Sequence, residues 1–233
     1  MATVAPWGTI MARPPTHSAT PTRMQPGLLT LVQWLSPAFP TGAFAYSHGL
    51  ETAIADGRLT DAATVQDWLA TVLHHGSGWQ DAVLLARGLS GEDLDQLSDL
   101  AHALAGSAER LAETMDQGTA FARTAAHVTG LALPARPLPL AVAEAARPLE
   151  MPVAEAVALY LHAFASNLVT IAVRAIPLGQ SQGQMILAAL HPLVHSLAQR
   201  AASASLDDLA SSAFAADLAA MAHETLQPRL FRT

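Results

Sequence analysis

The stretch VAEAVALYLHAFASNLVTIAVRAI, residues Val153–Ile176, is the most apolar part of the chain. Its apolar side chains recur at helical spacing on two neighbouring sides, one rich in large residues and the other in alanine. A helix that is apolar nearly all round lies inside a large core or across a membrane, and this one is long enough for a span. Glu155, His162 and Asn167 interrupt it, however, and such groups are costly in lipid. The pattern therefore predicts a helix buried in a protein core, with no membrane as a partner.

The composition around this segment favours a helical protein. The chain has 233 residues, 51% of them hydrophobic, and is rich in alanine, the best helix former. We predict an all-α fold, a single globular bundle of about ten helices around the central buried helix. The bundle is expected to cover residues 26–225 and to be followed by a tail at 226–233. The net charge of −7 argues against nucleic acid as a partner, because phosphate contacts need a basic surface.

Residues 1–25 differ from the rest of the chain in being rich in proline, threonine, serine and alanine without an apolar period. We expect them to form a disordered extension, and Met24 could be a second start site. They lack the charged-then-apolar order of a signal peptide. The chain has no cysteine, which excludes disulfides and thiolate metal sites and fits a reducing compartment. A cytoplasmic location is therefore expected.

A second distinctive stretch, SPAFPTGAFAYSHGLE at residues 36–51, has the pattern of an ordered loop. Pro37 and Pro40 each lock φ and remove an amide donor, so no regular helix passes through them. Gly42 can adopt the left-handed conformations that other residues avoid. Ordered loops on a rigid scaffold often carry binding functions, although a plain corner between two core helices would use the same residues.

Local signals also predict where helices begin. Ser47 is a plausible N-cap, which places Glu51 near the positive end of the helix dipole and Gly49 inside the helix. Other predicted starts use polar capping residues, namely Thr60 or Asp61, Ser90, Ser107 and Ser205. The last helix is expected to end near Glu224.

Several acidic side chains have structural interpretations. Asp81 lies close to a predicted helix N-terminus, where a carboxylate needs no functional reason. Glu109 and Glu113 are four residues apart on one helix, an arrangement whose repulsion costs roughly a few tenths of a kcal/mol. An arginine, from this chain or from a partner, would relieve that repulsion.

The sequence carries few signs of catalysis or metal binding. The chain has no lysine, so a Walker-type nucleotide loop is impossible, and no Gly-x-Ser-x-Gly elbow occurs. His191 and His195 are four apart on a predicted helix, and imidazole suits nickel, but an ordinary surface pair has the same spacing. His74 and His75 fit the negative end of a helix dipole. No metal site and no cofactor are predicted.

The loop at residues 36–51 resembles the N-terminal signature of the urease accessory protein F (UreF) family, Ser-Pro-x-x-Pro-x-Gly-x-Phe-x-Tyr-Ser-x-Gly-Leu-Glu. The matching positions are Ser36, Pro37, Pro40, Gly42, Phe44, Tyr46, Ser47, Gly49, Leu50 and Glu51. Ala43 stands where the family usually has a second glycine.

Three further elements resemble the same family. Its Glu-Thr-x-x-Gln-Gly element is matched by Glu113, Thr114, Gln117 and Gly118. Its Arg-x-Ile-Pro-Leu-Gly-Gln element is matched by RAIPLGQ, which contains Pro177 and Gly179. Its closing His-Glu-Thr and Arg-Leu-Phe-Arg elements are matched by His223, Glu224, Thr225, Arg229, Leu230, Phe231 and Arg232. The spacer at residues 226–228 departs from the usual pattern, and its proline would stop a helix.

This resemblance implies a urease maturation chaperone that is not an enzyme. It would form a homodimer and bridge UreD, also called UreH, and the GTPase UreG in a complex that delivers nickel to apo-urease and regulates the GTPase step. The partner-binding positions that carry over are Tyr46, Ser47, Glu51, Glu113, Arg229, Leu230, Phe231 and Arg232. The structural loop positions are Pro37, Pro40, Gly42, Phe44, Gly49, Pro177 and Gly179. Tyr46 and Arg229 match positions associated with GTPase recruitment, and the tail would dock or become ordered when UreD binds.

Two other hypotheses stay open from the residues alone. A direct nickel carrier would bind nickel tightly as an isolated chain. A helical hydrolase would use Ser47, His48 and a carboxylate such as Glu51, and would lose its turnover in a His48→Ala variant.

Overall fold

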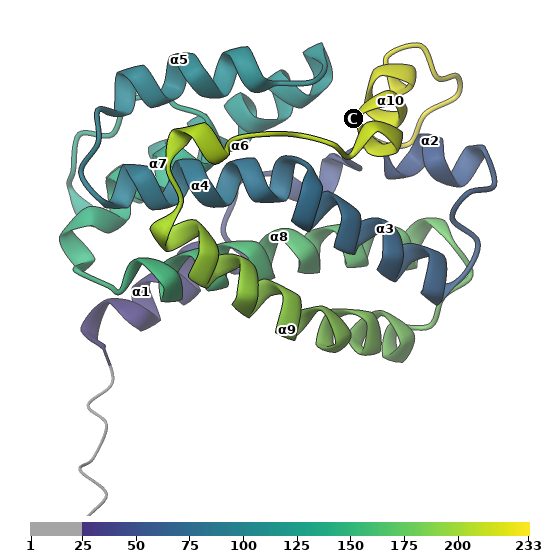
Figure 1. Cartoon of the computed structure of the whole chain (residues 1–233), viewed down its shortest axis with the longest axis horizontal. Coiled ribbons are helices and arrows are strands. Elements are labelled where there is room, and N and C mark those ends of the chain that lie inside the picture. Colours follow the sequence, from purple (N-terminus) through teal and green to yellow (C-terminus); the bar gives the residue numbers. More distant parts are fainter. Residues whose placement is uncertain (1–24) are drawn as a thin grey trace, which may run out of the picture.

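The computed structural model describes residues 25–233, and within that range every regular element is helical (Figure 1). This confirms the predicted all-α fold, whereas the predicted extension at residues 1–25 lies, except for its last residue, outside the described part. The α-helices are α1 (Pro26–Trp34), α2 (Leu50–Ala55), α3 (Ala62–His75), α4 (Ser77–Leu89), α5 (Leu94–Leu104), α6 (Ala108–Thr129), α7 (Leu138–Ala146), α8 (Val153–Ala175), α9 (Gln180–Ser203) and α10 (Phe214–His223). Short 3-10 turns occupy Ala43–Ala45, Arg147–Leu149 and Leu206–Asp208.

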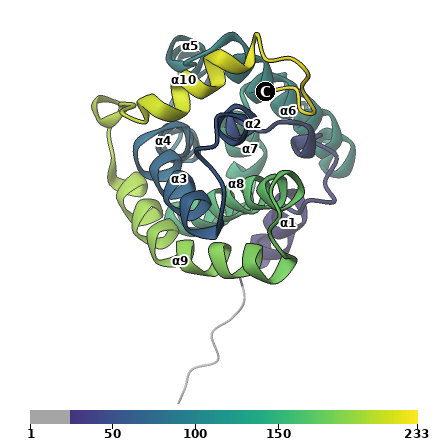
Figure 2. The same cartoon turned by 90° about the vertical axis from the view of Figure 1, so that its right-hand side faces the viewer.

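Helix α8 is the centre of the bundle, as its sequence predicts (Figures 1 and 2). It packs along α9 and also contacts α3 and α4. Val157, Leu161 and Ala165 are fully buried on its faces. By length and composition α8 could cross a bilayer. In this fold, however, its apolar surface is used as the contact surface for the surrounding helices.

Helix α6 packs against α7, which also packs against α4. This contact requires a glycine at position 118, because a Cβ there would overlap the carbonyl oxygen of Arg136. The Thr114 hydroxyl, one turn earlier on α6, accepts a hydrogen bond of 3.2 Å from the Leu138 amide at the start of α7. The Glu-Thr-x-x-Gln-Gly element therefore fixes α6 to α7.

Several predicted helix starts are confirmed and others are wrong. Asp61 caps α3 by accepting from the Thr64 amide, and the Ser107 hydroxyl accepts from the Arg110 amide in α6. Ser90 instead closes α4, and Asp93 caps α5 by accepting from two backbone amides.

The prediction that the last helix starts after Ser205 is also wrong. Only a 3-10 turn forms there, and α10 begins at Phe214. The intervening chain is held to other elements, because the Trp79 indole donates to the Asp208 carbonyl and the Ser212 amide donates to the His75 carbonyl. These non-local contacts keep the backbone from coiling into a helix.

The corner before α2 differs from the prediction that Ser47 caps the helix and Gly49 lies inside it. His48 and Gly49 both have left-handed φ, 56° and 77°, so the helix starts only at Leu50 and Gly49 is its N-cap. A Cβ on Gly49 would lie 2.9 Å from the Ala220 nitrogen of α10. Helix α10 therefore packs directly against the backbone of this corner.

Helix α10 buries its small side chains and exposes its large ones. Ala213, Ala216 and Ala219 are buried. By contrast, the exposed large apolar side chains of this helix are Phe214, Leu218 and Met221. The helix follows the upper rim of the bundle above α2 (Figure 2).

The tail at residues 226–233 folds back onto the body, so that the chain ends beside α6 and α10 (Figures 1 and 2). Phe231 and Thr233 are buried in this docked tail. Leu230, in contrast, is 86% exposed. The resemblance implied ordering of this segment when UreD binds. In this structure it is already docked on the chain's own loop.

Candidate functional site: the loop and the tail

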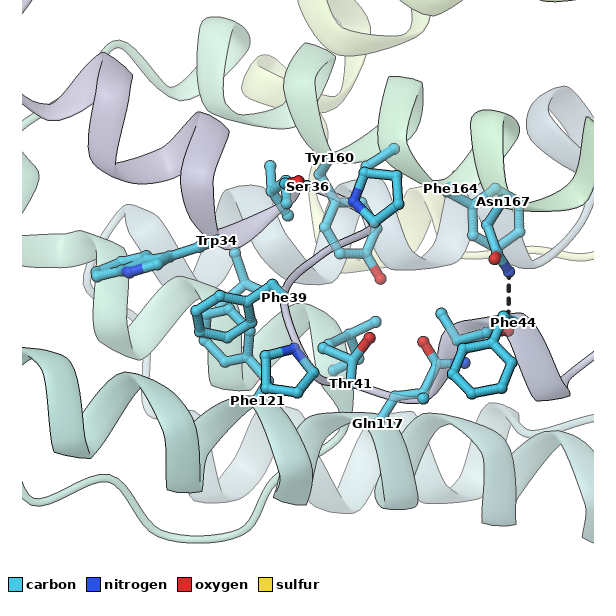
Figure 3. Close-up of a pocket in the computed structure, with 18 of the residues that line it drawn as sticks. Trp34, Ser36, Phe39, Thr41, Phe44, Gln117, Phe121, Tyr160, Phe164 and Asn167 are labelled. Carbon is cyan, nitrogen blue, oxygen red and sulfur yellow. Dashed lines mark hydrogen bonds between the residues drawn. The ribbon is translucent and has the colours of Figure 1, made fainter. Parts of the chain in front are cut away.

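The loop at residues 36–49 crosses between α6 and α8 (Figure 3). Gly42 has a φ of 76°, in the left-handed region that its sequence context predicts. Asn167 of α8 donates to the Ala43 carbonyl at 3.1 Å and anchors the loop. The Phe44 side chain, expected to be structural, is 65% exposed at the edge of the loop.

A cavity of about 400 Å³ lies under this loop (Figure 3). The aromatic residues in its lining are Trp34, Phe39, Phe44, Phe121, Tyr160 and Phe164. Polar atoms come from Glu113, Gln117 and Asn167. The volume falls in the range of about 300–1,000 Å³ that is usual for small-ligand pockets, and it would also hold an apolar side chain of a partner.

Backbone hydrogen bonds join the tail to the loop. The Ser47 amide donates to the Thr233 carbonyl at 2.7 Å, and the Arg232 amide donates to the Ala45 carbonyl at 2.8 Å. The Ser47 hydroxyl also donates to the Thr233 carbonyl, and the His48 amide donates to the Thr233 hydroxyl at 3.2 Å. Ser47 thus serves mainly as an anchor for the tail.

Glu51 is the second anchor of the tail. One carboxylate oxygen accepts from the Leu230 amide at 2.6 Å and the other accepts from the Phe231 amide at 3.0 Å. The second oxygen also contacts the His223 ring at 3.0 Å. Burial disfavours the charged form, but the hydrogen bonds from His223 and the two amides outweigh it and lower the pKa of Glu51.

Tyr46 pairs with Arg232 rather than with Arg229. The Tyr46 hydroxyl donates to Asp116 at 2.7 Å and accepts from Arg232 at 3.1 Å. Burial, together with the hydrogen bond to Asp116, raises the pKa of Tyr46 to about 12. Arg229 instead donates to Glu109 at 2.6 Å. Tyr46 and Arg229, which the resemblance alone associates with GTPase recruitment, therefore have different partners within the chain.

Glu113 lies at the centre of a buried polar cluster beneath the tail. Its carboxylate contacts His48 at 3.2 Å, Arg110 at 3.6 Å and the Thr233 hydroxyl at 3.3 Å. Burial opposes ionisation, but His48 and Arg110 outweigh it and lower the pKa of Glu113. This confirms that an arginine relieves the repulsion between Glu109 and Glu113, and it comes from this chain.

The same cluster corrects the interpretation of Asp81 as an ordinary carboxylate at a helix start. Asp81 is buried, pairs with Arg110 at 3.2 Å and accepts from the Tyr160 hydroxyl at 2.8 Å. It therefore links α4 to α6 and α8. The sequence has no local signal for this link, because Arg110 and Tyr160 are remote in the chain.

The hydrolase constellation of Ser47, His48 and Glu51 does not assemble. Ser47 and Glu51 bind the tail, whereas the His48 ring lies between Glu113 and the Ser77 hydroxyl, at 2.5 Å from the latter. The cavity beside Ser77 measures about 70 Å³, too small for a typical substrate. The contacts of Ser47, His48 and Glu51 are best explained as hydrogen bonds that hold the loop to the tail and to the neighbouring helices.

The histidine pair His191 and His195 is exposed on α9. The His162 ring lies 5.4 Å from that of His191, and burial, with His191 nearby, lowers the pKa of His162. Within residues 25–233, no group of three or more histidines, cysteines or acidic residues is arranged to hold a metal ion. Among the described residues, the pair therefore does not belong to a cluster with a third histidine or acidic ligand.

The remaining loop positions, Pro177 and Gly179, form the turn between α8 and α9. The Gly179 amide donates to the Gln182 side chain at 2.9 Å as α9 starts. Just before this turn, Arg174 lies 5.4 Å from the centre of the Phe231 ring and so connects α8 to the tail.

The sequence model of the UreF family matches residues 59–191, more than half of the chain. A urease accessory protein UreF from Cereibacter sphaeroides (strain ATCC 17025) is 60% identical over 210 residues, which cover 90% of this chain and 100% of that protein. The chain belongs to the UreF family. UreF of Roseobacter denitrificans is 47% identical over 207 residues, covering 88% of this chain and 93% of that protein. UreF of a Jannaschia species is 49% identical over 208 residues, which cover 89% of this chain and 94% of that protein.

Membership of the UreF family makes this chain a urease accessory protein with a part in urease maturation. Two of the residues that hold the loop and the tail together had only weak sequence signals. His223 was visible solely as part of the His-Glu-Thr match, and Glu109 solely through its spacing from Glu113. Their joint role with Glu51 appears only once the chain is folded.

Proposed function

We propose that this UreF protein gathers UreD and the GTPase UreG into a complex that delivers nickel to apo-urease, and that it regulates the GTPase step. The observation that carries this proposal is the docking of the tail on the loop. The docked tail and loop together present one exposed surface, here called the loop–tail surface and formed by Phe44, Arg229, Leu230 and Arg232. Tyr46 is buried beneath Arg232 and supports this surface from below.

The composition of the loop–tail surface supports a binding role. Phe44 and Leu230 are 65% and 86% exposed, so two large apolar side chains point away from the body. The side chains of Arg229 and Arg232 are 44% and 67% exposed. Aromatic and arginine side chains dominate the energetics of protein interfaces, so this combination favours partner recognition.

Two apolar patches support several simultaneous contacts. Phe214, Leu218 and Met221 form an exposed stripe on α10, which leads directly to the tail. Leu29 and Val32 form a second exposed patch on α1, away from α10 in both views (Figures 1 and 2). We assign the α10 stripe to UreD and the α1 patch to the homodimer, because the two contacts then do not compete.

In this proposal UreD binds next to the tail and holds it in its docked position. UreG then recognises the loop–tail surface, with Arg229 as a direct contact. Arg229 is suited to this because its ion pair with Glu109 is partly exposed and contributes little to stability. The protein itself carries out no bond chemistry.

The test is a pull-down of UreG and UreD with an Arg229→Ala variant. We expect UreD to be retained and UreG to be recovered at least about tenfold less well, the effect of losing one interface arginine. Arg123→Ala, at an exposed arginine of α6, is the matched control. Normal recovery of the three-protein complex with Arg229→Ala would contradict the proposal.

A further inference from the structure

His223, the last residue of α10, occupies a fully buried position between α2 and α6. Its side chain has 0% exposure. The Nδ1 atom lies 2.7 Å from a carboxylate oxygen of Glu109, and the Nε2 atom lies 3.0 Å from a carboxylate oxygen of Glu51. Both ring nitrogens are therefore within hydrogen-bond distance of a carboxylate, and no solvent reaches the ring.

The positions of the two carboxylates bear on the hydrogen-bonding roles of the ring nitrogens. An ionised carboxylate only accepts hydrogen bonds, and a neutral imidazole has a single N–H donor. With both carboxylates ionised, the two contacts at these distances are satisfied together only by a ring that carries two N–H donors, the imidazolium. A neutral ring would place an unshared pair of nitrogen electrons against one carboxylate, a buried repulsion that water could not relieve.

The two carboxylates that hold His223 also hold the tail. Glu51 accepts from the amides of Leu230 and Phe231, and Glu109 accepts from the guanidinium of Arg229. The charges facing the ring are thus Glu51 from α2, Glu109 from α6 and, beyond Glu109, Arg229 from the tail.

On the ring's own element, Glu224 follows His223 directly and is turned towards α6. Its carboxylate accepts from the Ala108 amide at 3.0 Å. Glu224 thus binds the first turn of α6 and does not contact the His223 ring. The carboxylates that contact the ring are those of Glu51 and Glu109.

We propose that His223 is a proton-dependent latch for the tail. In its charged form the ring fixes the two carboxylates in the orientation that captures residues 229–231. Loss of the proton leaves one carboxylate without its buried donor, and the tail is released while the bundle around α8 stays folded. The latch concerns the isolated chain and does not rest on the proposed partners, although its opening would remove the loop–tail surface.

The first test uses the unmodified full-length protein and nuclear magnetic resonance of its histidine rings. We expect both nitrogens of His223 to be protonated at neutral pH, with exposed His195 as the internal comparison. As the pH rises, the amide signals of Leu230 and Phe231 should shift together with the His223 ring and not with His195. A ring with one protonated nitrogen, or tail amides that do not follow it, would overturn the proposal.

The second test uses trypsin, which in this lysine-free chain cuts only after arginine and can remove the tail at Arg229–Leu230. In His223→Gln we expect cleavage there to be about tenfold faster, the effect of losing one charged hydrogen bond, with unchanged helix content by circular dichroism. His195→Gln is the matched control. Equal cleavage rates in the two variants would refute the latch, and if His223→Gln fails to fold, the resonance titration of the unmodified protein decides.

Discussion

The Ser47 amide donates a 2.7 Å hydrogen bond to the carbonyl of Thr233, although 186 residues separate the two in the sequence. This bond closes the chain on itself at the UreF signature loop. A partner that binds the loop therefore also contacts the tail for as long as the tail is docked.

Glu51→Gln should free the tail, because it removes the charge that binds two tail amides and the His223 ring. The amides of Leu230 and Phe231 should exchange with deuterium about tenfold faster or more, since hydrogen bonds to charged groups are worth roughly 1.5–3 kcal/mol. Glu155→Gln, at an exposed glutamate of α8, should leave their exchange unchanged. Unaltered exchange in Glu51→Gln would show that the tail is held by other contacts.

Acid should loosen the tail before it unfolds the bundle. The pKa values of Glu51 and Glu113 are held below the ordinary 4.5, so their contribution to docking is complete above that value. This contribution to docking is lost as the pH falls through the lowered pKa values of Glu51 and Glu113, because the protonated carboxyls bind the tail less well. Tail amide signals followed from neutral to acidic pH check this, with helix content recorded in parallel. Simultaneous loss of both signals would contradict the prediction.

Tyrosine ionisation should report whether the Tyr46 contacts persist in solution. The chain has two tyrosines, and Tyr160 is fully buried against Asp81, which raises its pKa well above the ordinary 10.0. Tyr46 is raised to about 12. Ultraviolet absorbance of the native protein should therefore show little tyrosinate at pH 10, whereas the denatured chain should be about half ionised there. Half-ionisation of one tyrosine near pH 10 in the native protein would mean that Tyr46 does not hold Asp116.

Gly49→Ala should destabilise the packing of α10 on the corner before α2, for two separate reasons. The φ of 77° is unfavourable for alanine by about 1–2 kcal/mol, and the new Cβ would lie 2.9 Å from the Ala220 nitrogen. Gly57→Ala is the matched control, because Gly57 has a φ of 71° and open space around its Cβ position. Thermal unfolding should show a clearly larger loss for Gly49→Ala. Equal losses would mean that the contact with α10 is unimportant.

The predictions from sequence succeeded where the physical cause is local or periodic. The apolar period of α8 does not depend on the partners of the helix, so its burial could be inferred from the chain alone. The caps at Asp61 and Ser107 bind amides within three residues, and the left-handed turn at Gly42 follows from its missing side chain. The predictions failed at Ser90, which closes α4 and does not start a helix, and at Ser47, whose hydroxyl binds the Thr233 carbonyl as well as the Glu51 amide and is not the N-cap.

The sequence by itself determined that this chain is helical, that α8 is its core and that its signature loop matches the UreF family. Only the tertiary structure decided what the loop does inside the molecule. The hydrogen bonds of Ser47 and Glu51 to the tail, and the placement of His223 between two carboxylates, join residues more than 100 positions apart. Such pairings follow from how the helices pack. A side chain that could bond to its sequence neighbours gives no local sign that it will bond to a distant residue instead.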